Sequence, residues 1–218
     1  MEKGVLKRWI KENDGLHSQA TRHPFILSIR DGTVDFSSYK RWLEQDYLFV
    51  RNFVPFVASV LVKASRESEN DSDMEIILGG MAALNDEILW FKKEASKWNV
   101  QLSHVVPQHA TEAYCRLLEI LINPETDYTT AVTAFWAIEA VYQQSFSLCL
   151  ESDSKTPAEL MQACRRWGND DFGTYCESLR RIADRHLAHA PEDVRKKAEE
   201  AFKLILQLEV DFWNMSFG

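Results

Sequence analysis

The residues of this sequence best suited to chemistry are carboxylates on apolar helical faces. Glu139 is the only charged residue in the apolar segment 131–150. Phe135, Tyr142 and Phe146 lie four positions before, three after and seven after it, so a helix places all of them on one face. A carboxylate buried there without a partner costs roughly several kcal/mol. Either a structural partner satisfies Glu139, or the residue handles protons for a ligand.

Two other acids occur in the same kind of pattern. Asp46 shares a helical face with Val50, four positions on, and Glu209 shares one with Phe212, three positions on. Three widely separated segments thus each direct an acid inward among aromatic residues. Together they predict an aromatic-lined pocket that holds several carboxylates.

The ordinary explanation for an inward acid is pairing with an arginine, a tyrosine or a backbone group. That explanation is weaker for Glu139 and Glu209, because segments 131–150 and 204–215 contain no Lys or Arg. Buried acids without a nearby cation have altered protonation, which suits general acid–base catalysis.

The cysteines do not indicate a competing site. They show neither C-x-x-C nor zinc-ligand spacing, and we interpret them as reduced thiols of a cytosolic protein. Cys149 is ten positions after Glu139, about 280° around a helix, and so lies on another face. The four are Cys115, Cys149, Cys164 and Cys176.

Metal and haem sites are not favoured either. A di-iron helical bundle requires Glu-x-x-His pairs, which the sequence lacks. His186 and His189 have a ligand-like spacing, but in a polar stretch near a helix end, which favours a solvated cap. His17 and His23 have no glycine-rich distal helix opposite them. No phosphate-binding or dinucleotide fingerprint is present, so we expect no metal and no cofactor.

The elements that position these residues are predicted to be helices throughout. Almost every segment has helical periodicity, and no alternating run bounded by turns indicates a strand. The pattern predicts one all-α domain over residues 1–218. Expected helices cover 5–14, 24–30, 36–65, 73–98, 110–122, 129–150, 157–168, 171–188 and 191–215, with a capping box at Thr156–Glu159 beginning the seventh.

Composition limits the partners and the compartment. The 218-residue chain has a formal net charge of −8, which argues against a general nucleic-acid or anionic-membrane surface. Its N-terminus is too charged for a signal peptide, so we expect a cytoplasmic protein. No apolar run is uniform enough to predict a membrane span; segment 131–150 comes nearest.

Four motifs in order resemble the TenA / thiaminase II family over essentially the whole chain. They are QDYLFVRNF at 45–53, VPQHATEAY at 106–114, TAFWAIEAVY at 133–142 and LEVDFW at 208–213. The sequence is most similar to the plant-type TenA-E branch, which has a glutamate and lacks the nucleophilic cysteine. The resemblance implies a haem-oxygenase-like helical bundle without haem, and a homo-oligomer, dimer or tetramer.

The resemblance also implies roles for the inward acids. Asp46 matches the residue that binds the aminopyrimidine substrate, and Glu209 matches the catalytic glutamate. Glu139 is expected to take over where relatives carry the cysteine, near position 134 or 135. The family's tyrosine after the helix containing Trp167 is absent from its expected place, 168–172. Further substrate contacts are expected from Tyr47, Phe49, Tyr114 and Tyr142.

The expected activity is hydrolysis in thiamin salvage. The glutamate branch removes formate from N-formyl-4-amino-5-aminomethyl-2-methylpyrimidine, and then replaces the amine with hydroxyl to give the hydroxymethylpyrimidine. Without the cysteine, thiamin cleavage is not expected. Three alternatives remain: a pyrimidine-binding protein without turnover, a helical interaction protein with structural acids, and a redox enzyme of the same broad fold.

Overall fold

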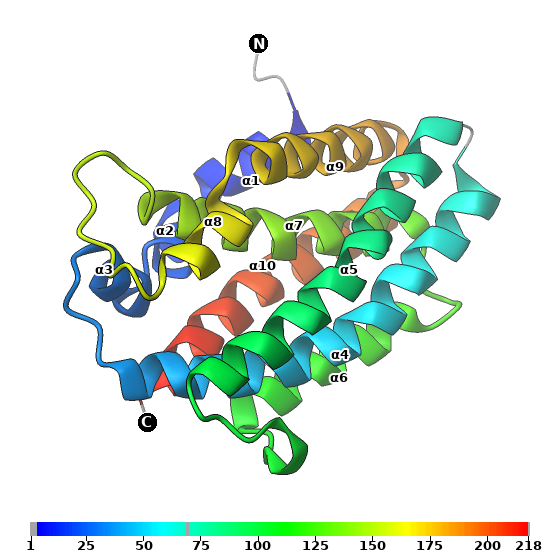
Figure 1. The fold of residues 1–218 in the computed structure, drawn as a ribbon. Coiled ribbons are helices and arrows are strands. Elements are labelled where there is room, and N and C mark those ends of the chain that lie inside the picture. The colour runs from blue at the N-terminus through cyan, green and yellow to red at the C-terminus, as the bar shows by residue number, and fades with distance from the viewer. Residues whose placement is uncertain (1–3, 69, 218) are drawn as a thin grey trace.

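The computed structural model describes residues 4–68 and 70–217, and within these ranges the protein is helical with no strand, as predicted (Figure 1). The longer elements are α4 (Phe36–Glu67), α5 (Asp71–Lys97), α6 (His109–Ile122), α7 (Tyr128–Leu148), α9 (Asp170–His189) and α10 (Glu192–Asn214). The shorter ones are α1 (Val5–Glu12), α2 (Asp14–Thr21), α3 (Pro24–Arg30), α8 (Met161–Gly168), and the 3₁₀ turns η1 (Leu102–His104) and η2 (Met215–Phe217).

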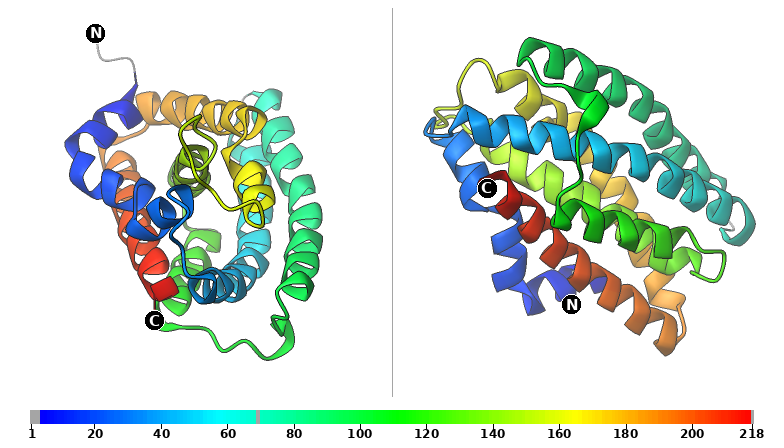
Figure 2. Two further views of the ribbon diagram at one scale, coloured as in Figure 1. Left: turned by 60° about the vertical axis from the view of Figure 1, so that its left-hand side comes forward. Right: turned by 90° about the horizontal axis from the view of Figure 1, so that it is seen from below.

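Helix α7 forms the centre of the bundle. It packs against α10, α9, α8 and α4, and in the left view of Figure 2 the other helices surround it. Its sequence explains the position, because apolar residues occur on all sides of the helix and most of its side chains are buried. Asp127 caps its N-terminus by accepting from the Thr130 amide at 2.7 Å. Glu139 therefore lies in the middle of the most enclosed helix.

Helix α4 places Asp46 beside α7. Asp35 caps this helix as predicted, accepting from the Ser37 amide at 3.0 Å. By length and composition alone, α4 is apolar enough to cross a membrane, a property that the sequence patterns did not indicate. Core helices share this property, and here α4 packs against α5, α6 and α7.

Helix α5 forms an outer wall of the bundle. It packs mainly on α4 and more lightly on α9, and Leu78 and Leu89 on its outer side are about half exposed. A β-carbon on Gly80 would overlap the Tyr175 hydroxyl, so glycine at this position allows α9 to approach α5 closely.

Two of the predicted element boundaries are wrong. The helix expected over 5–14 ends at Glu12, and a separate helix that the sequence analysis did not predict, α2, begins at Asp14. The expected capping box does not form, because Thr156 hydrogen-bonds to the Cys149 carbonyl at 2.9 Å and α8 begins only at Met161. Thr156 therefore takes part in the hydrogen-bond network of a loop and does not cap a helix.

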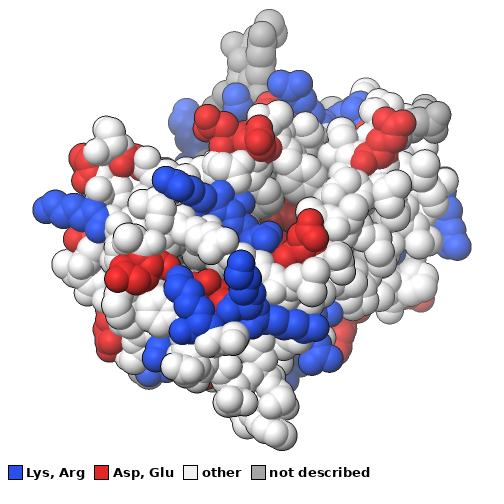
Figure 3. All heavy atoms as spheres, viewed as in Figure 1, with Lys and Arg blue, Asp and Glu red and all other residues white. Residues whose placement is uncertain are grey.

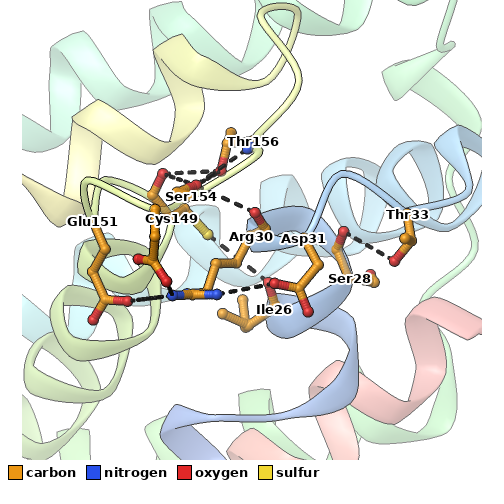
Figure 4. A network of polar contacts seen from close by, with 10 residues as sticks. Ile26, Ser28, Arg30, Asp31, Thr33, Cys149, Glu151, Ser154 and Thr156 are labelled. Atoms are coloured by element: carbon orange, nitrogen blue, oxygen red, sulfur yellow. Dashed lines mark hydrogen bonds and ion pairs between the residues drawn. The ribbon is translucent and has the colours of Figure 1, made fainter.

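That network fastens the end of α3 to the loop after α7 (Figure 4). The Arg30 guanidinium donates to Asp31 at 3.0 Å, to Glu151 at 2.9 Å and to Asp153 at 2.7 Å. The Arg30 carbonyl accepts from the Lys155 amide at 2.7 Å. These acids are exposed and each has a cationic partner, unlike the acids of the bundle interior described next.

Candidate active site

A cavity in the interior of the bundle brings inward acids from three helices together. Its volume is about 20 Å³, room for one water-sized body, so a pyrimidine ring enters only if side chains move. It is lined by Asp46, Phe49, Val50 and Phe53 from α4, Glu87 from α5, Ile138, Glu139 and Tyr142 from α7, and Trp167 from α8.

Asp46 is buried and only half satisfied. Its Oδ1 accepts from the Tyr142 hydroxyl at 2.9 Å, whereas its Oδ2 has no hydrogen-bond partner. Burial raises the pKa of this carboxyl well above its usual range; the Tyr142 hydrogen bond opposes the shift, and the charges of Glu87 and Glu209 add to it. Asp46 therefore holds a proton readily and has one free oxygen.

Glu209, on α10, has the same arrangement. Its Oε1 accepts from the Tyr114 hydroxyl at 2.6 Å, and its Oε2 is without a partner. Burial raises the pKa of Glu209 to about 8, against the opposing Tyr114 hydrogen bond. Glu209 is not among the lining residues, but its charge raises the pKa of both Asp46 and Glu139, which places it beside the cavity.

Glu139 lines the cavity from α7. It is enclosed by protein, yet part of its surface remains accessible because it faces the cavity. Burial raises the pKa of Glu139 well above its usual range, and the charges of Glu87 and Glu209 add to the shift. Among the described residues, no basic side chain opposes this shift, in agreement with the absence of Lys and Arg from segment 131–150.

Glu87 is a fourth acid of the cavity, and the sequence analysis did not identify it. Burial raises the pKa of Glu87 to about 7, while the charge of Arg166 and a hydrogen bond from the Trp167 indole oppose the rise. Leu84 and Phe91 lie three positions before and four after Glu87. This spacing places Glu87 on an apolar helical face, as the corresponding spacing does for Glu139.

The predicted aromatic contacts divide into three groups. Phe49 and Tyr142 line the cavity. Tyr114 lies behind Phe49, with ring centroids 4.6 Å apart, and contacts Glu209 instead. Tyr47 is not in the lining: its ring packs 6.3 Å from that of Phe91. This position favours a packing role for Tyr47.

The wall expected near 168–172 is provided by Trp167. Its ring meets those of Trp42 and Trp90 edge to face, at 5.8 and 5.3 Å between centroids. A β-carbon on the next residue, Gly168, would clash with the Phe146 carbonyl, so glycine lets α8 pack directly onto α7. An indole thus occupies the wall that the sequence motif left undefined.

A thiol also approaches the site from another helix. Cys176, on α9, lies close enough that the charge of Glu139 adds to burial in raising the pKa of the Cys176 thiol. The thiol is therefore protonated and a poor nucleophile. Among the described residues, no group of three or more His, Cys, Asp or Glu side chains is arranged to hold a metal ion.

A larger hollow of about 680 Å³ lies elsewhere, beside Glu67, Thr129 and His189. It is open, and two of its basic side chains, Arg185 and His186, already pair with the buried Asp73. These two basic groups are thus already paired, whereas Asp46 in the interior cavity keeps an open oxygen. We therefore assign the candidate active site to the interior cavity.

Residues 10–218 match the TENA/THI-4/PQQC family. The chain belongs to this family. It is 59% identical over 215 residues, 99% of this chain and 94% of the relative, to a Glycine max protein described as a "Probable bifunctional TENA-E protein". It is also 22% identical over 202 residues, 90% of this chain and 88% of the relative, to a Halalkalibacterium halodurans protein described as an aminopyrimidine aminohydrolase.

Solved structures show the same fold. A TenA homologue from Pyrococcus furiosus superimposes with a TM-score of 0.88 at 21% identity, covering 97% of this chain and 98% of that one. A domain from Shewanella denitrificans described as having a heme oxygenase-like fold gives 0.73 at 12% identity, covering 97% and 91%. The TenA resemblance and the expected fold class are therefore confirmed.

Proposed function

We propose that this TenA family member hydrolyses aminopyrimidines, removing formate from N-formyl-4-amino-5-aminomethyl-2-methylpyrimidine and converting the free amine to the hydroxymethylpyrimidine with release of ammonia. One observation carries the proposal: Asp46 and Glu209 each keep an unpartnered buried oxygen. Groups of this kind need a polar ligand to satisfy them. The names of the soybean and Halalkalibacterium relatives support the same chemistry.

Asp46 is suited to bind the ring. An aminopyrimidine presents an exocyclic N–H next to a ring nitrogen, and a carboxylate accepts from both when that nitrogen is protonated. Because burial raises its pKa, Asp46 has a proton to give to the ring nitrogen as the substrate binds. The resulting ion pair leaves the ring electron-poor, and Tyr142 continues to donate to the other oxygen of Asp46.

Glu209 is suited to transfer the proton in amine hydrolysis. In this step the C–N bond breaks, ammonia leaves with the bonding pair, and a water oxygen bonds to the methylene carbon. A glutamate side chain with a pKa of about 8 can take a proton from the attacking water and pass it to the departing ammonia. The balance is R–CH₂–NH₃⁺ and water giving R–CH₂–OH and NH₄⁺.

Glu139 is assigned to orienting the water. In deformylation, water oxygen bonds to the formyl carbon, the C–N bond breaks, and the nitrogen leaves as the protonated amine with formate as co-product. Glu139 lines the cavity on the α7 segment that carries the cysteine in relatives. A carboxyl there holds water by hydrogen bonds and forms no covalent intermediate.

Turnover separates this proposal from a protein that only binds pyrimidines. The purified protein is incubated with the formyl and the free-amine pyrimidine, and formate and ammonia are measured. We expect both products. The Glu44→Gln variant is a matched control, because Glu44 lies on α4 outside the cavity lining and its loss should leave turnover unchanged. Retained ligand without release of either product would refute the enzyme proposal.

A further inference from the structure

Glu87 lines the cavity but has no role in the mechanism above. We propose that Glu87 holds the cationic 5-aminomethyl group of the substrate and thereby sets the preference for the free amine over the uncharged formyl and hydroxyl forms. This inference rests on the proposed function for the identity of the ligand. It adds a specificity residue that comes from α5, a helix that carries none of the expected site residues.

The position of Glu87 supports the assignment. The four acids divide into two kinds: Asp46 and Glu209 each accept from a tyrosine hydroxyl, whereas Glu87 and Glu139 do not. Ring positions 4 and 5 of the pyrimidine are adjacent, so a ring held by Asp46 keeps its 5-substituent within a few ångströms of that carboxyl. The other carboxyls among the lining residues are those of Glu87 and Glu139.

Charge distinguishes these two acids. The charge of Arg166 and the Trp167 indole both favour ionisation of Glu87, and nothing comparable acts on Glu139. Glu87 is therefore the more readily ionised of the two acids in this half of the cavity. An ammonium group gains from an adjacent carboxylate in a dry site, whereas a formamide or a hydroxyl gains much less.

Arg166 is held in place to support Glu87. Its guanidinium lies 5.3 Å from the centroid of the Trp90 ring and donates to the Asp86 carbonyl at 3.4 Å. The groups that interact electrostatically with Glu87 come from four other helices. They are Arg166 from α8, Asp46 from α4, Glu139 from α7 and Tyr175 from α9. Arg166 is the one cation in this set.

Glu87 also lies next to exposed residues of α5. Asn85 and Asp86, its neighbours on α5, are exposed, and Glu87 itself is only half-buried. The face of the molecule in Figure 3, to which α5, α8 and α9 contribute, carries acidic and basic side chains intermingled.

The test compares the binding of three ligands, which are the aminomethyl, hydroxymethyl and formylaminomethyl pyrimidines. Binding is measured by calorimetry in a Glu139→Gln, Glu209→Gln background, in which neither the amine nor the formyl compound is consumed. We expect Glu87→Gln to weaken binding of the aminomethyl ligand about 10- to 100-fold and of the other two less than about 3-fold. Glu75→Gln, a change of an exposed acid on the same helix outside the cavity lining, is the matched control and should leave all three unchanged.

Three results would overturn the proposal: equal weakening of all three ligands, no weakening of any, or the same loss in Glu87→Asp, which keeps the charge, as in Glu87→Gln. If Glu87→Gln folds poorly, the Arg166→Gln variant is tested in its place. It should reduce the preference for the amine at pH 7 by about 3- to 10-fold without affecting binding of the neutral ligands. An unchanged preference would refute the proposed role of Glu87. The proposed function fails by a different result: the wild-type protein would release neither ammonia nor formate.

Discussion

Two pairs of buried acids in this protein differ in the donors and cations that contact them. Asp73 and Glu94 are 0% and 3% exposed, and Asp46 and Glu209 are 1% and 0% exposed. Burial is thus the same in the two pairs. The first pair lies at the junctions of helices, whereas the second lies at the interior cavity.

The junction acids are satisfied by cations and donors. Asp73 accepts from Arg185 and, at 2.7 Å, from the Ser68 hydroxyl, and it pairs with His186 at 3.2 Å. Burial opposes ionisation of Asp73, but these partners outweigh it and lower its pKa. Glu94 is likewise held, by the Trp98 indole at 2.7 Å, the Tyr39 hydroxyl at 3.1 Å and Lys97 at 3.2 Å.

Asp46 and Glu209 have one tyrosine each and one free oxygen each. The pKa of Asp46 and that of Glu209 are raised instead of lowered. The comparison shows that burial of an acid does not by itself indicate function. An acid that is buried, left without a cation and left with an open oxygen is the kind that our proposed function assigns to ligand binding.

The largest expected effect is on catalysis at the cavity. Glu209→Gln should lower the rate of ammonia release about 10²- to 10⁴-fold, the usual contribution of a general acid or base. Ammonia release and circular dichroism are measured together, because the variant should remain folded. A rate like that of the wild type would remove Glu209 from the mechanism.

Glu209 and Asp73 should also respond to pH in opposite directions. The pKa of Glu209 is about 8 in the folded protein and about 4.5 when unfolded. The unfolded chain therefore releases this proton first, and stability falls as pH rises from about 4.5 to 8. At pH 7 the effect is about 3 kcal/mol. The lowered pKa of Asp73 has the opposite sign, so its contribution is present at neutral pH and lost on acidification.

Denaturant unfolding of the wild type and Glu209→Gln across pH 4.5–8.5 tests this prediction. The variant should be the more stable at pH 7 to 8, and the two proteins should converge near pH 4.5. Parallel curves at all pH values would show that Glu209 does not hold a proton in the folded state.

The next effect is on ligand binding. Asp46→Asn should weaken binding of the hydroxymethylpyrimidine about 10- to 100-fold, because a neutral amide replaces a charge-assisted contact. Calorimetric titration of the ligand measures the change. Unchanged affinity would show that Asp46 does not bind the pyrimidine ring. Asp46 would then be a structural acid like Asp73 and Glu94.

The smallest expected effect is at the junction. Asp73→Asn should destabilise the fold by about 1–3 kcal/mol, since Arg185 and His186 lose their charged partner. The melting temperature should fall by about 2–12 °C for a chain of this size, while the catalytic rate per folded molecule stays the same. A stable Asp73→Asn variant with reduced turnover would contradict the structural role of this acid.

Sequence reasoning identified three of the four cavity acids and missed Glu87. Glu139 stands out because its whole segment is apolar, so one charge is conspicuous. Glu87 follows Asn85 and Asp86 on a helix with an exposed outer side, and its inward face is masked by these polar neighbours. The helical spacing of Leu84 and Phe91 does place Glu87 on an apolar face. The polar residues on the other side of the helix make this face hard to recognise in the sequence.

The boundaries that were wrong have a similar cause. Thr156 has the local sequence of a helix cap, but its hydroxyl bonds to the carbonyl of Cys149, seven residues earlier. Local propensity is weak in energy, so a loop contact of similar strength overrides it.

The sequence by itself determined the helices, the apolar face of each, and the presence of Asp46, Glu139 and Glu209 on those faces, because helical periodicity is a local property. Only the tertiary structure decided which acids are satisfied. Tyr142 reaches Asp46 across 96 positions, Tyr114 reaches Glu209 across 95, and Arg185 reaches Asp73 across 112. A periodic pattern shows that a side chain faces inward, but the partner it meets there depends on how the helices pack.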